Sequence, residues 1–206
     1  MDAQTFIALA LRNPANDAIL TALAAMRLSD AWLVSSCLVQ TVWNVLTGRP
    51  VDYGINDYDV LYFDADTSWE AEDRVIKKMD ATARELGAPV QVRNQARVHL
   101  WYQQKFGRPY PQLSCATESI DLFLTRNTKV GIRRSSDGDE VYAPNGFDDI
   151  AGLLITPNLT PNFSLVHYLE KAARWKALWP ELTLIEAETW SHAERDRASP
   201  RSNENS

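Results

Sequence analysis

The sequence predicts an α/β (α+β) protein in which a mixed sheet is flanked by helices. Two observations carry this prediction. Short apolar runs suited to buried strands alternate with longer Ala- and Leu-rich stretches that follow the helical period. The Asp137-Gly138 pair, with short β-prone runs on both sides, is a strong signal for a β-hairpin. No internal repeat interrupts this alternation, so we expect one α/β domain.

The first half of the chain alternates helices and strands. The expected elements are helices at 5–11 and 17–26, a strand at 32–34, a helix at 38–46, a strand at 59–63, a helix ending near 86, a strand at 89–93 and a helix at 96–106. Pro14 is expected to break the chain between the first two helices. Thr67-Ser68-Trp69-Glu70 has the form of a capping box, and Gly87 and Pro89 close the helix that it opens.

The second half contains the hairpin, two more helices and a polar tail. The hairpin strands are expected at 128–134 and 140–143, and the helices at 147–154 and 164–178. The last helix carries an apolar stripe made of Leu165, Tyr168, Leu169, Ala172, Trp175 and Trp179. From about residue 191 the chain is rich in Ser, Arg and Glu without an apolar period, which predicts disorder.

Length and composition limit the class of protein. The 206 residues suffice for one domain with a sizeable core. No apolar run reaches the length of a membrane span, and the first residues do not form a signal peptide. With only two cysteines, neither a disulfide framework nor a cysteine zinc cage is expected, so we expect a cytoplasmic protein. The net charge of −6 argues against long DNA as a partner but allows a nucleotide.

Asp57 and Asp59 are the strongest candidates for a site. Their i, i+2 spacing at the start of a strand places both carboxylates on one face. Two like charges so close together are costly unless a cation lies between them, and a divalent cation with oxygen ligands, typically Mg²⁺, fits best. The alternative interpretation is a solvated acidic pair at the start of an edge strand.

Upstream of this pair, the chain turns from a strand into a helix at Ser35-Ser36. Small residues at such a turn let a phosphate approach the backbone N–H groups, and the helix N-terminus adds partial positive charge. A phosphate turn followed by two carboxylates on the next strand is the layout of a nucleotidyltransferase.

The chain resembles a family of small bacterial nucleotidyltransferase-like proteins in the DNA polymerase beta superfamily. The resemblance covers roughly residues 30–182. It is carried by Trp32-Leu33-Val34, Cys37-Leu38, Thr41-Val42-Trp43-Asn44, Gly48-Arg49-Pro50, Ile55-Asn56-Asp57-Tyr58-Asp59, Ser68-Trp69-Glu70-Ala71-Glu72, Val92-Arg93-Asn94-Gln95-Ala96-Arg97-Val98-His99-Leu100-Trp101-Tyr102, Phe106-Gly107, Tyr110-Pro111, Val130-Gly131-Ile132-Arg133, Tyr142-Ala143-Pro144, Gly146, Asp148-Asp149, Lys171, Trp175 and Trp179-Pro180.

This resemblance implies a fold, a domain layout and an activity. Residues 30–182 would be the nucleotidyltransferase-like domain, with a helical segment at 1–29 packed on it and a mostly disordered tail at 183–206. The implied activity is Mg²⁺- or Mn²⁺-dependent transfer of a nucleoside monophosphate from an NTP to a hydroxyl acceptor, with release of pyrophosphate. The acceptor, a small molecule, a protein or tRNA, stays open. A catalytically inactive member that binds a nucleotide or protein partner, and a toxin- or antitoxin-type member acting on tRNA or protein, are the alternatives.

Within this resemblance the chain departs from its relatives at Ser36, where they have glycine. Loss of that glycine removes conformational freedom that a phosphate turn needs. Ser35 is the alternative source of a hydroxyl for the phosphates.

A third carboxylate is expected to complete the metal site. Asp121, in the apolar run Ser119-Ile120-Asp121-Leu122-Phe123, suits the superfamily arrangement, and a surface acid on a short helix is the alternative. Asp64 has the opposite strand parity from Asp57 and Asp59, so we expect it to cap the following turn instead.

A second polar cluster consists of Asn94, Gln95, Arg97 and His99. Side chains of these types read base edges or phosphates, and a histidine can assist proton transfer. The alternative is that they hold a turn and cap the helix that begins near Ala96. Trp101 and Tyr102 suit base stacking or the core, and Lys105 and Arg133 suit phosphate counter-charges or exposed surface. His167, on an amphipathic helix, is not expected to be a ligand.

Overall fold

A five-stranded mixed sheet organises the protein in the computed structural model, which describes residues 1–28 and 30–186. The strands are β1 (Ala31–Val34), β2 (Tyr58–Tyr62), β3 (Val90–Asn94), β4 (Gly131–Ser135) and β5 (Gly138–Tyr142). Their order is β3-β2-β1-β4-β5; β2 and β3 are parallel, and the other neighbours are antiparallel. The predicted mixed α/β fold is confirmed. Residues 187–206, and with them the predicted disorder from residue 191, lie outside the described residues.

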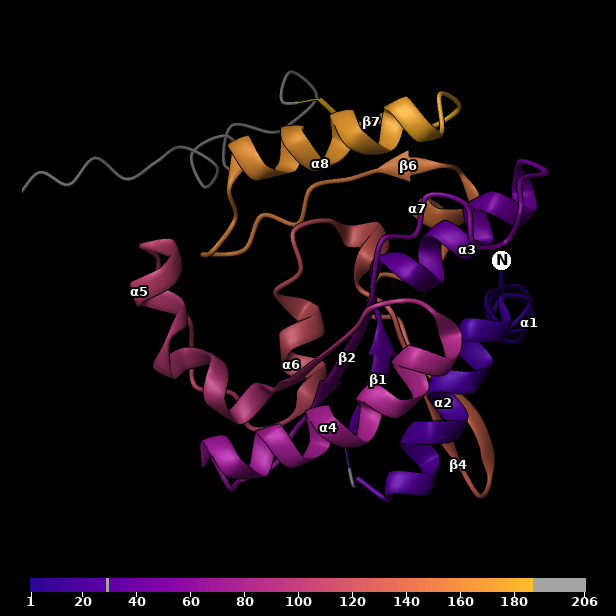
Figure 1. Cartoon of the computed structure of the whole chain (residues 1–206). Helices are drawn as coiled ribbons and strands as arrows, with labels where there is room; N and C mark the ends of the chain where they lie inside the picture. The colour runs from indigo at the N-terminus through magenta and orange to yellow at the C-terminus, as the bar shows by residue number, and fades with distance from the viewer. Residues whose placement is uncertain (29, 187–206) are drawn as a thin grey trace, which may run out of the picture.

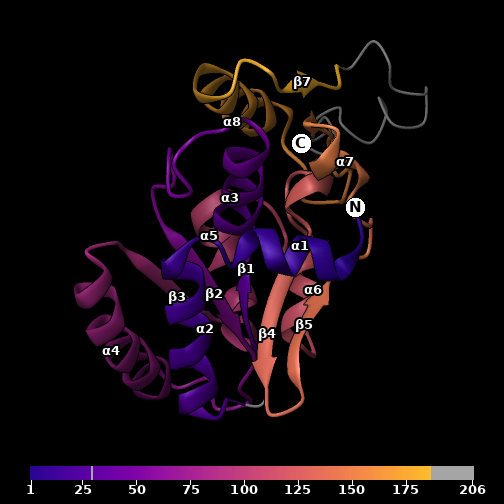
Figure 2. The same ribbon diagram turned by 90° about the vertical axis from the view of Figure 1, so that its right-hand side faces the viewer.

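One face of the sheet is covered by helices. The helices α1 (Ala3–Ala10), α2 (Pro14–Met26) and α4 (Trp69–Leu86) lie on this side, as Figures 1 and 2 show. Leu33, Val60, Val92 and Ile132 alternate along their strands toward this side and form the main core with the helices. Helix α3 (Ser36–Leu46), which follows β1 directly, is buried over most of its length because its apolar residues join the same core.

The C-terminal helix α8 (Leu165–Leu178) lies across one end of the sheet (Figure 1). It is fixed to α3 by tryptophans: the ring of Trp43 is 5.2 Å from that of Trp175 and 5.8 Å from that of Trp179. Trp179 also donates its indole N–H to Asn44 Oδ1 at 2.8 Å. Such edge-to-face contacts between buried rings hold α8 firmly against the domain.

The segments around α8 are short. They are η2 (Arg126–Thr128), α7 (Asp148–Ala151) and the parallel pair β6 (Leu154–Ile155) and β7 (Thr183–Leu184). The helix predicted at 147–154 is therefore too long. Its final part is a strand because the chain leaves the helix at Gly152, and Leu153 has a left-handed φ of 55°.

The opposite face, which carries Trp32, Val34 and Leu61, is called the open face below. These three side chains pack on Ala116 and Ile120 of α6 (Ala116–Asp121) in a second, smaller apolar cluster. The chain from β3 continues on this side through the 3₁₀ helix η1 (Gln95–Leu100) and α5 (Tyr102–Phe106), which stands apart from the sheet in Figure 1.

Several local predictions are confirmed with small shifts. Pro14 is the first residue of α2 rather than a break, and the Asn13 side chain caps the helix by accepting from Ala15 N at 3.0 Å. Ser68 is the N-cap of α4 and accepts from Ala71 N. The expected helix at 96–106 is present as η1 and α5, separated at Trp101. No helix in the described ranges is both long enough and apolar enough to cross a bilayer.

Candidate functional site

Asp57 and Asp59 lie at the edge of the open face, as their spacing predicts. Asp59 is paired in register with Val34 of β1 on one side and with Gln91 of β3 on the other. Side chains at paired positions share a face, so this row runs across three strands on the open face. Gln91 donates its side-chain amide to the Asp57 carboxylate. The two carboxylates therefore lie together where β2 begins.

Two cations balance this acidic pair. Burial raises the pKa of Asp59 to about 6, and the Asp57 charge adds to the rise, while Lys171 and Arg93 oppose it. Burial lowers the pKa of Lys171 to about 8, against the attraction of Asp59. Lys171 comes from α8 and also lies over the Trp175 ring, 4.7 Å from its centroid. Two negative and two positive groups thus share one partly buried site, which suits the binding of a charged ligand.

The turn between β1 and α3 lies next to this site, because Val34 pairs with Asp59 and Ser35 follows Val34. Ser35 has a left-handed backbone, with φ 68° and ψ −134°, and is buried. Its side chain makes no capping hydrogen bond to α3, so the N–H groups of the first helical turn have no side-chain acceptor there. The conformation that favours glycine is therefore at Ser35, whereas Ser36 is already helical.

Asp121 does not join the pair. Its carboxylate accepts from Tyr142 Oη at 2.9 Å and lies 3.5 Å from Lys129 Nζ. Within residues 1–28 and 30–186, no three His, Cys, Asp or Glu side chains gather closely enough to hold one metal ion. The expected convergence of three carboxylates is not found, because α6 ends beside β5 and holds Asp121 there. Asp64 caps the next turn as expected, accepting from Asp66 N at 2.9 Å.

The residues present fit a divalent cation that is completed by a substrate. Asp57 and Asp59 offer two hard carboxylates, and Mg²⁺ is commonly held by one or two carboxylates together with substrate phosphates and water. The Ser35 turn on the neighbouring strand is where such phosphates would lie.

Most of the second polar cluster has a structural role. Asn94 accepts from Ala96 N and Asp64 N and donates to the carbonyl oxygens of Asp64 and Asp66, so it ties η1 to the loop after β2. Arg97 lies 3.2 Å from the Glu72 carboxylate and donates to Thr67 O.

These contacts match the alternative role expected for Asn94 and Arg97, because their polar groups hold the loop that precedes α4. His99 has a buried Nδ1 without a hydrogen-bond partner and does not reach the cavity described next. Gln95 does line that cavity and donates to Arg93 O at 3.2 Å.

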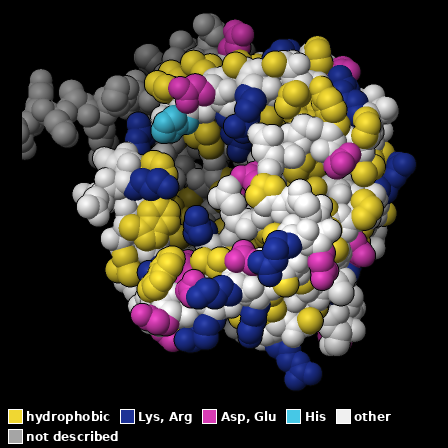
Figure 3. All heavy atoms as spheres, viewed as in Figure 1, with side chains coloured by type: hydrophobic (Ala, Val, Ile, Leu, Met, Phe, Trp, Pro, Cys, Tyr) yellow, Lys and Arg dark blue, Asp and Glu magenta, His cyan; other side chains and the backbone are white. Residues whose placement is uncertain are grey.

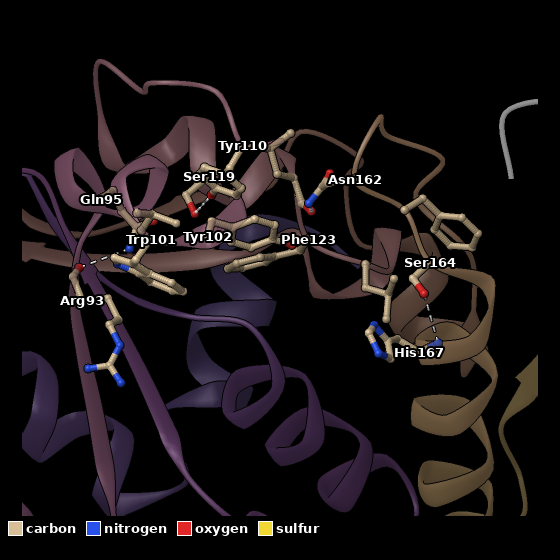
Figure 4. Close-up of a pocket in the computed structure, with 14 residues that line it drawn as sticks. Arg93, Gln95, Trp101, Tyr102, Tyr110, Ser119, Phe123, Asn162, Ser164 and His167 are labelled. Carbon is tan, nitrogen blue, oxygen red and sulfur yellow. Dashed lines mark hydrogen bonds between the residues drawn. The ribbon is translucent and has the colours of Figure 1, made fainter. Parts of the chain in front are cut away.

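A cavity of about 320 Å³ lies on the open-face side of the sheet. Its apolar walls include the aromatic rings of Trp101, Tyr102, Tyr110 and Phe123. Figure 4 places Trp101 and Arg93 on one side and His167 with Ser164 on the other. The space-filling view shows a hollow in this face of the molecule (Figure 3). The volume is in the range of small-ligand pockets.

The sequence analysis assigned no site role to three residues that lie here: Arg93 and Lys171 were named only as part of the resemblance, and His167 was not expected to be a ligand. Arg93 was detectable, because Gln91 and Arg93 have the opposite strand parity from the apolar residues Val90 and Val92. Lys171 and His167 carry no local signal, since only the packing of α8 brings them to the sheet.

The two cations singled out in the sequence are engaged elsewhere. Lys105 Nζ lies over the Trp101 and Phe106 rings, and Arg133 pairs with Glu140 and lies over Trp32.

Comparisons with known proteins identify a family and a similar fold. A family described as Nucleotidyltransferase matches residues 21–184. A protein solved by NMR, described as revealing a CCA-adding enzyme head domain, superposes with a TM-score of 0.69 at 23% sequence identity, covering 90% of this chain and 97% of that one. At this level of identity, the likeness shows a shared fold and nothing more. A search of curated proteins gives no match.

Proposed function

The chain belongs to the nucleotidyltransferase family, and we propose that it transfers a nucleoside monophosphate from an NTP to a hydroxyl acceptor and releases pyrophosphate. One observation carries the proposal: the Ser35 turn, Asp59 and Gln91 are neighbours across three strands of the open face. That row brings the turn proposed to bind phosphate, the carboxylate pair and the next strand together, with Lys171 and Arg93 as the nearby cations.

Each group has a role in binding the triphosphate. The N–H groups of the first turn of α3 and the Ser36 hydroxyl would donate to phosphate oxygens, helped by the helix dipole. Lys171 and Arg93 balance the carboxylates in the free protein, and they would form charge-assisted hydrogen bonds to the phosphates of a bound NTP. Asp57 and Asp59 would hold Mg²⁺ or Mn²⁺, which supplies charge stabilisation for the transferred phosphoryl group.

The transfer itself is a displacement at the α-phosphorus. The acceptor oxygen forms a bond to this phosphorus, and the bond from it to the oxygen bridging to the β-phosphate breaks. The electron pair leaves with pyrophosphate, and the hydroxyl proton passes to solvent water. The protein contributes mainly position and charge, which is where catalysis of phosphoryl transfer chiefly arises.

A specific observation favours a second candidate, a protein that binds an NTP without transferring it. Asp57 and Asp59 have no third carboxylate beside them among the described residues. The group expected to help activate the acceptor hydroxyl is therefore missing from the site. Such a protein would bind the nucleotide but would not transfer the nucleoside monophosphate to an acceptor.

Manganese binding and label transfer together test the proposal. Because the two carboxylates need substrate phosphates to complete a cation site, Mn²⁺ is expected to bind weakly alone and at least about tenfold more tightly with a non-hydrolysable ATP analogue. Asp57→Asn removes one of the proposed cation ligands, so the analogue should no longer tighten Mn²⁺ binding. The same variant is expected to lower transfer from α-labelled NTPs by about 100-fold or more. Electron paramagnetic resonance and product chromatography measure the two effects.

Asp121→Asn is the matched control. Tyr142 and Lys129 hold that carboxylate away from the pair, so both readouts should stay close to wild type. Nucleotide-dependent Mn²⁺ binding without transfer to small molecules, tRNA or protein would select the binding-only candidate. Equal loss in Asp57→Asn and Asp121→Asn would contradict the two-carboxylate site.

A further inference from the structure

Two elements, β3 and α8, contribute residues both to the cavity and to the site around the carboxylates. Arg93 lines the cavity and lies on the same face of β3 as Gln91, two residues further on, where Gln91 is paired with Asp59. On α8, His167 lines the cavity, and Lys171 acts on the same carboxylate one turn later. Residues at i and i+4 lie on one helical face, so α8 presents one surface to both places. A molecule in the cavity would therefore end close to Asp57 and Asp59.

The walls of the cavity suit an aromatic ring. Trp101 and Tyr102 pack at 6.1 Å between ring centroids, and Tyr102 and Tyr110 at 4.5 Å, so one wall is an aromatic surface. Ser119, whose hydroxyl lies 2.9 Å from Tyr110 Oη, and Asn162 add polar groups at single points. Apolar walls with a few placed polar groups are the usual form of a site for a small planar molecule.

The charge of the lining limits the ligand further. Among the described residues that line the cavity, none is Asp or Glu, and Arg93 is the one Lys or Arg. A cationic ligand would find no counter-charge among these lining residues themselves. A tRNA would require contacts to several phosphates from a basic surface, which one arginine does not provide. A neutral or anionic small molecule is the best fit.

The direction of the transfer assigns the cavity to the acceptor. In phosphoryl transfer the attacking and leaving oxygens lie roughly in line on opposite sides of the phosphorus. The leaving pyrophosphate belongs at the Ser35 turn, on the β1 side of Asp59. The attacking oxygen then comes from the β3 side, where Arg93 of β3 lines the cavity.

We propose that this cavity binds the acceptor substrate, and that the acceptor is a small neutral or anionic aromatic molecule that carries a hydroxyl group. This inference rests on the proposed nucleotidyl transfer. The hydroxyl oxygen of the bound molecule forms the new bond to the α-phosphorus, its proton passes to water, and pyrophosphate leaves with the electrons of the broken bond. The product is a nucleoside monophosphate ester of the aromatic molecule.

A binding experiment tests the cavity without any catalysis. Adenosine, pyridoxine and 4-hydroxyphenylacetate are titrated into the full chain, and the indole N–H signal of Trp101, assigned with Trp101→Phe, is followed by NMR. At least one probe is expected to shift this signal with a Kd below about 1 mM. His167→Trp, at an exposed position of α8 that lines the cavity, should weaken that binding at least about tenfold by filling the space.

Val166→Trp is the matched control. Val166 is the neighbouring residue on the same helix, is 63% exposed and does not line the cavity, so it should bind the probe like wild type. If no probe shifts Trp101, or if both variants behave alike, the inference is wrong. The probe and a non-hydrolysable ATP analogue with Mn²⁺ should bind together. Displacement of the probe by the analogue would make the cavity a nucleobase site and overturn the acceptor assignment.

A transfer experiment separates this inference from the proposed function. Wild-type protein is incubated with α-labelled NTPs, Mn²⁺ and three separate acceptor pools: the small-molecule fraction of a cell extract, tRNA and protein. Label is expected in an ultraviolet-absorbing small molecule, with transfer at least about tenfold lower in His167→Trp and unchanged in Val166→Trp. Label on tRNA or protein would overturn the inference and leave nucleotidyl transfer intact. A probe that binds without any transfer would contradict the proposed function instead.

Discussion

At the scale of single residues, Ser35 is one of three described residues other than glycine that have a positive φ. Its φ of 68° and ψ of −134° lie in a region that residues with a Cβ rarely adopt, and such strain costs about 1–3 kcal/mol. Strain of this kind collects at functional sites, and this residue directly follows Val34, which is paired with Asp59. The departure at Ser36 matters less than the sequence indicates, because Ser36 is the first residue of α3.

Ser35→Gly should therefore stabilise the protein. Relief of the strained angle outweighs the added freedom of the unfolded chain, for a net gain of about 1 kcal/mol. In a domain of this size, that gain raises the melting temperature by about 2–4 °C. Circular dichroism during heating measures the change.

Ser36→Gly is the control, since glycine in the first turn of α3 has no strain to relieve and should lower the melting temperature slightly. If Ser36→Gly stabilises the protein and Ser35→Gly does not, the assignment of the strained position is wrong.

At the scale of elements, the junction of β3 with η1 is held by one side chain. Asn94 is buried and makes four hydrogen bonds, to Ala96 N at 3.1 Å, Asp64 N at 3.1 Å, Asp64 O at 2.9 Å and Asp66 O at 3.3 Å. The sequence has polar residues at this turn, and that pattern is compatible both with binding a ligand and with holding the turn. The contacts favour the structural role, because an amide committed to four backbone groups is not available to a ligand.

Asn94→Ala should destabilise the protein by about 2–3 kcal/mol, because it leaves buried backbone groups without partners. A fall of roughly 4–12 °C in melting temperature is expected, with nucleotide affinity unchanged below that temperature. Asn56→Ala, at an exposed position, is the control and should melt like wild type. Loss of nucleotide binding in folded Asn94→Ala would support the original assignment to the ligand.

At the scale of the whole molecule, α8 completes the site. It is anchored to α3 through Trp43, Trp175 and Trp179, and this packing carries Lys171 to the carboxylate pair. The burial of Lys171 costs free energy that the nearby carboxylates partly offset. A buried cation kept at an acidic pair is well placed to meet an incoming triphosphate.

Lys171→Met keeps the length of the side chain and removes its charge. We expect the affinity for a non-hydrolysable ATP analogue to fall about tenfold, the value of one charge-assisted hydrogen bond. Isothermal titration calorimetry measures it. Lys176→Met is the control on the same helix, because Lys176 donates to Leu182 O and not into the site. Equal affinities in the two variants would remove Lys171 from the phosphate site.

The sequence by itself determined the order of the five strands of the main sheet, most of the helices between them, the hairpin, and the placement of Asp57 and Asp59 at the start of one strand. These features depend on side chains a few residues apart, which the period of a strand or helix relates directly. Only the tertiary structure decided that Asp121 stands apart, and that Arg93, Lys171 and His167 gather instead beside the carboxylate pair. They come from β3 and α8, and no local pattern records which distant elements pack together. The register of β1, β2 and β3 and the tryptophan contacts of α8 set that arrangement.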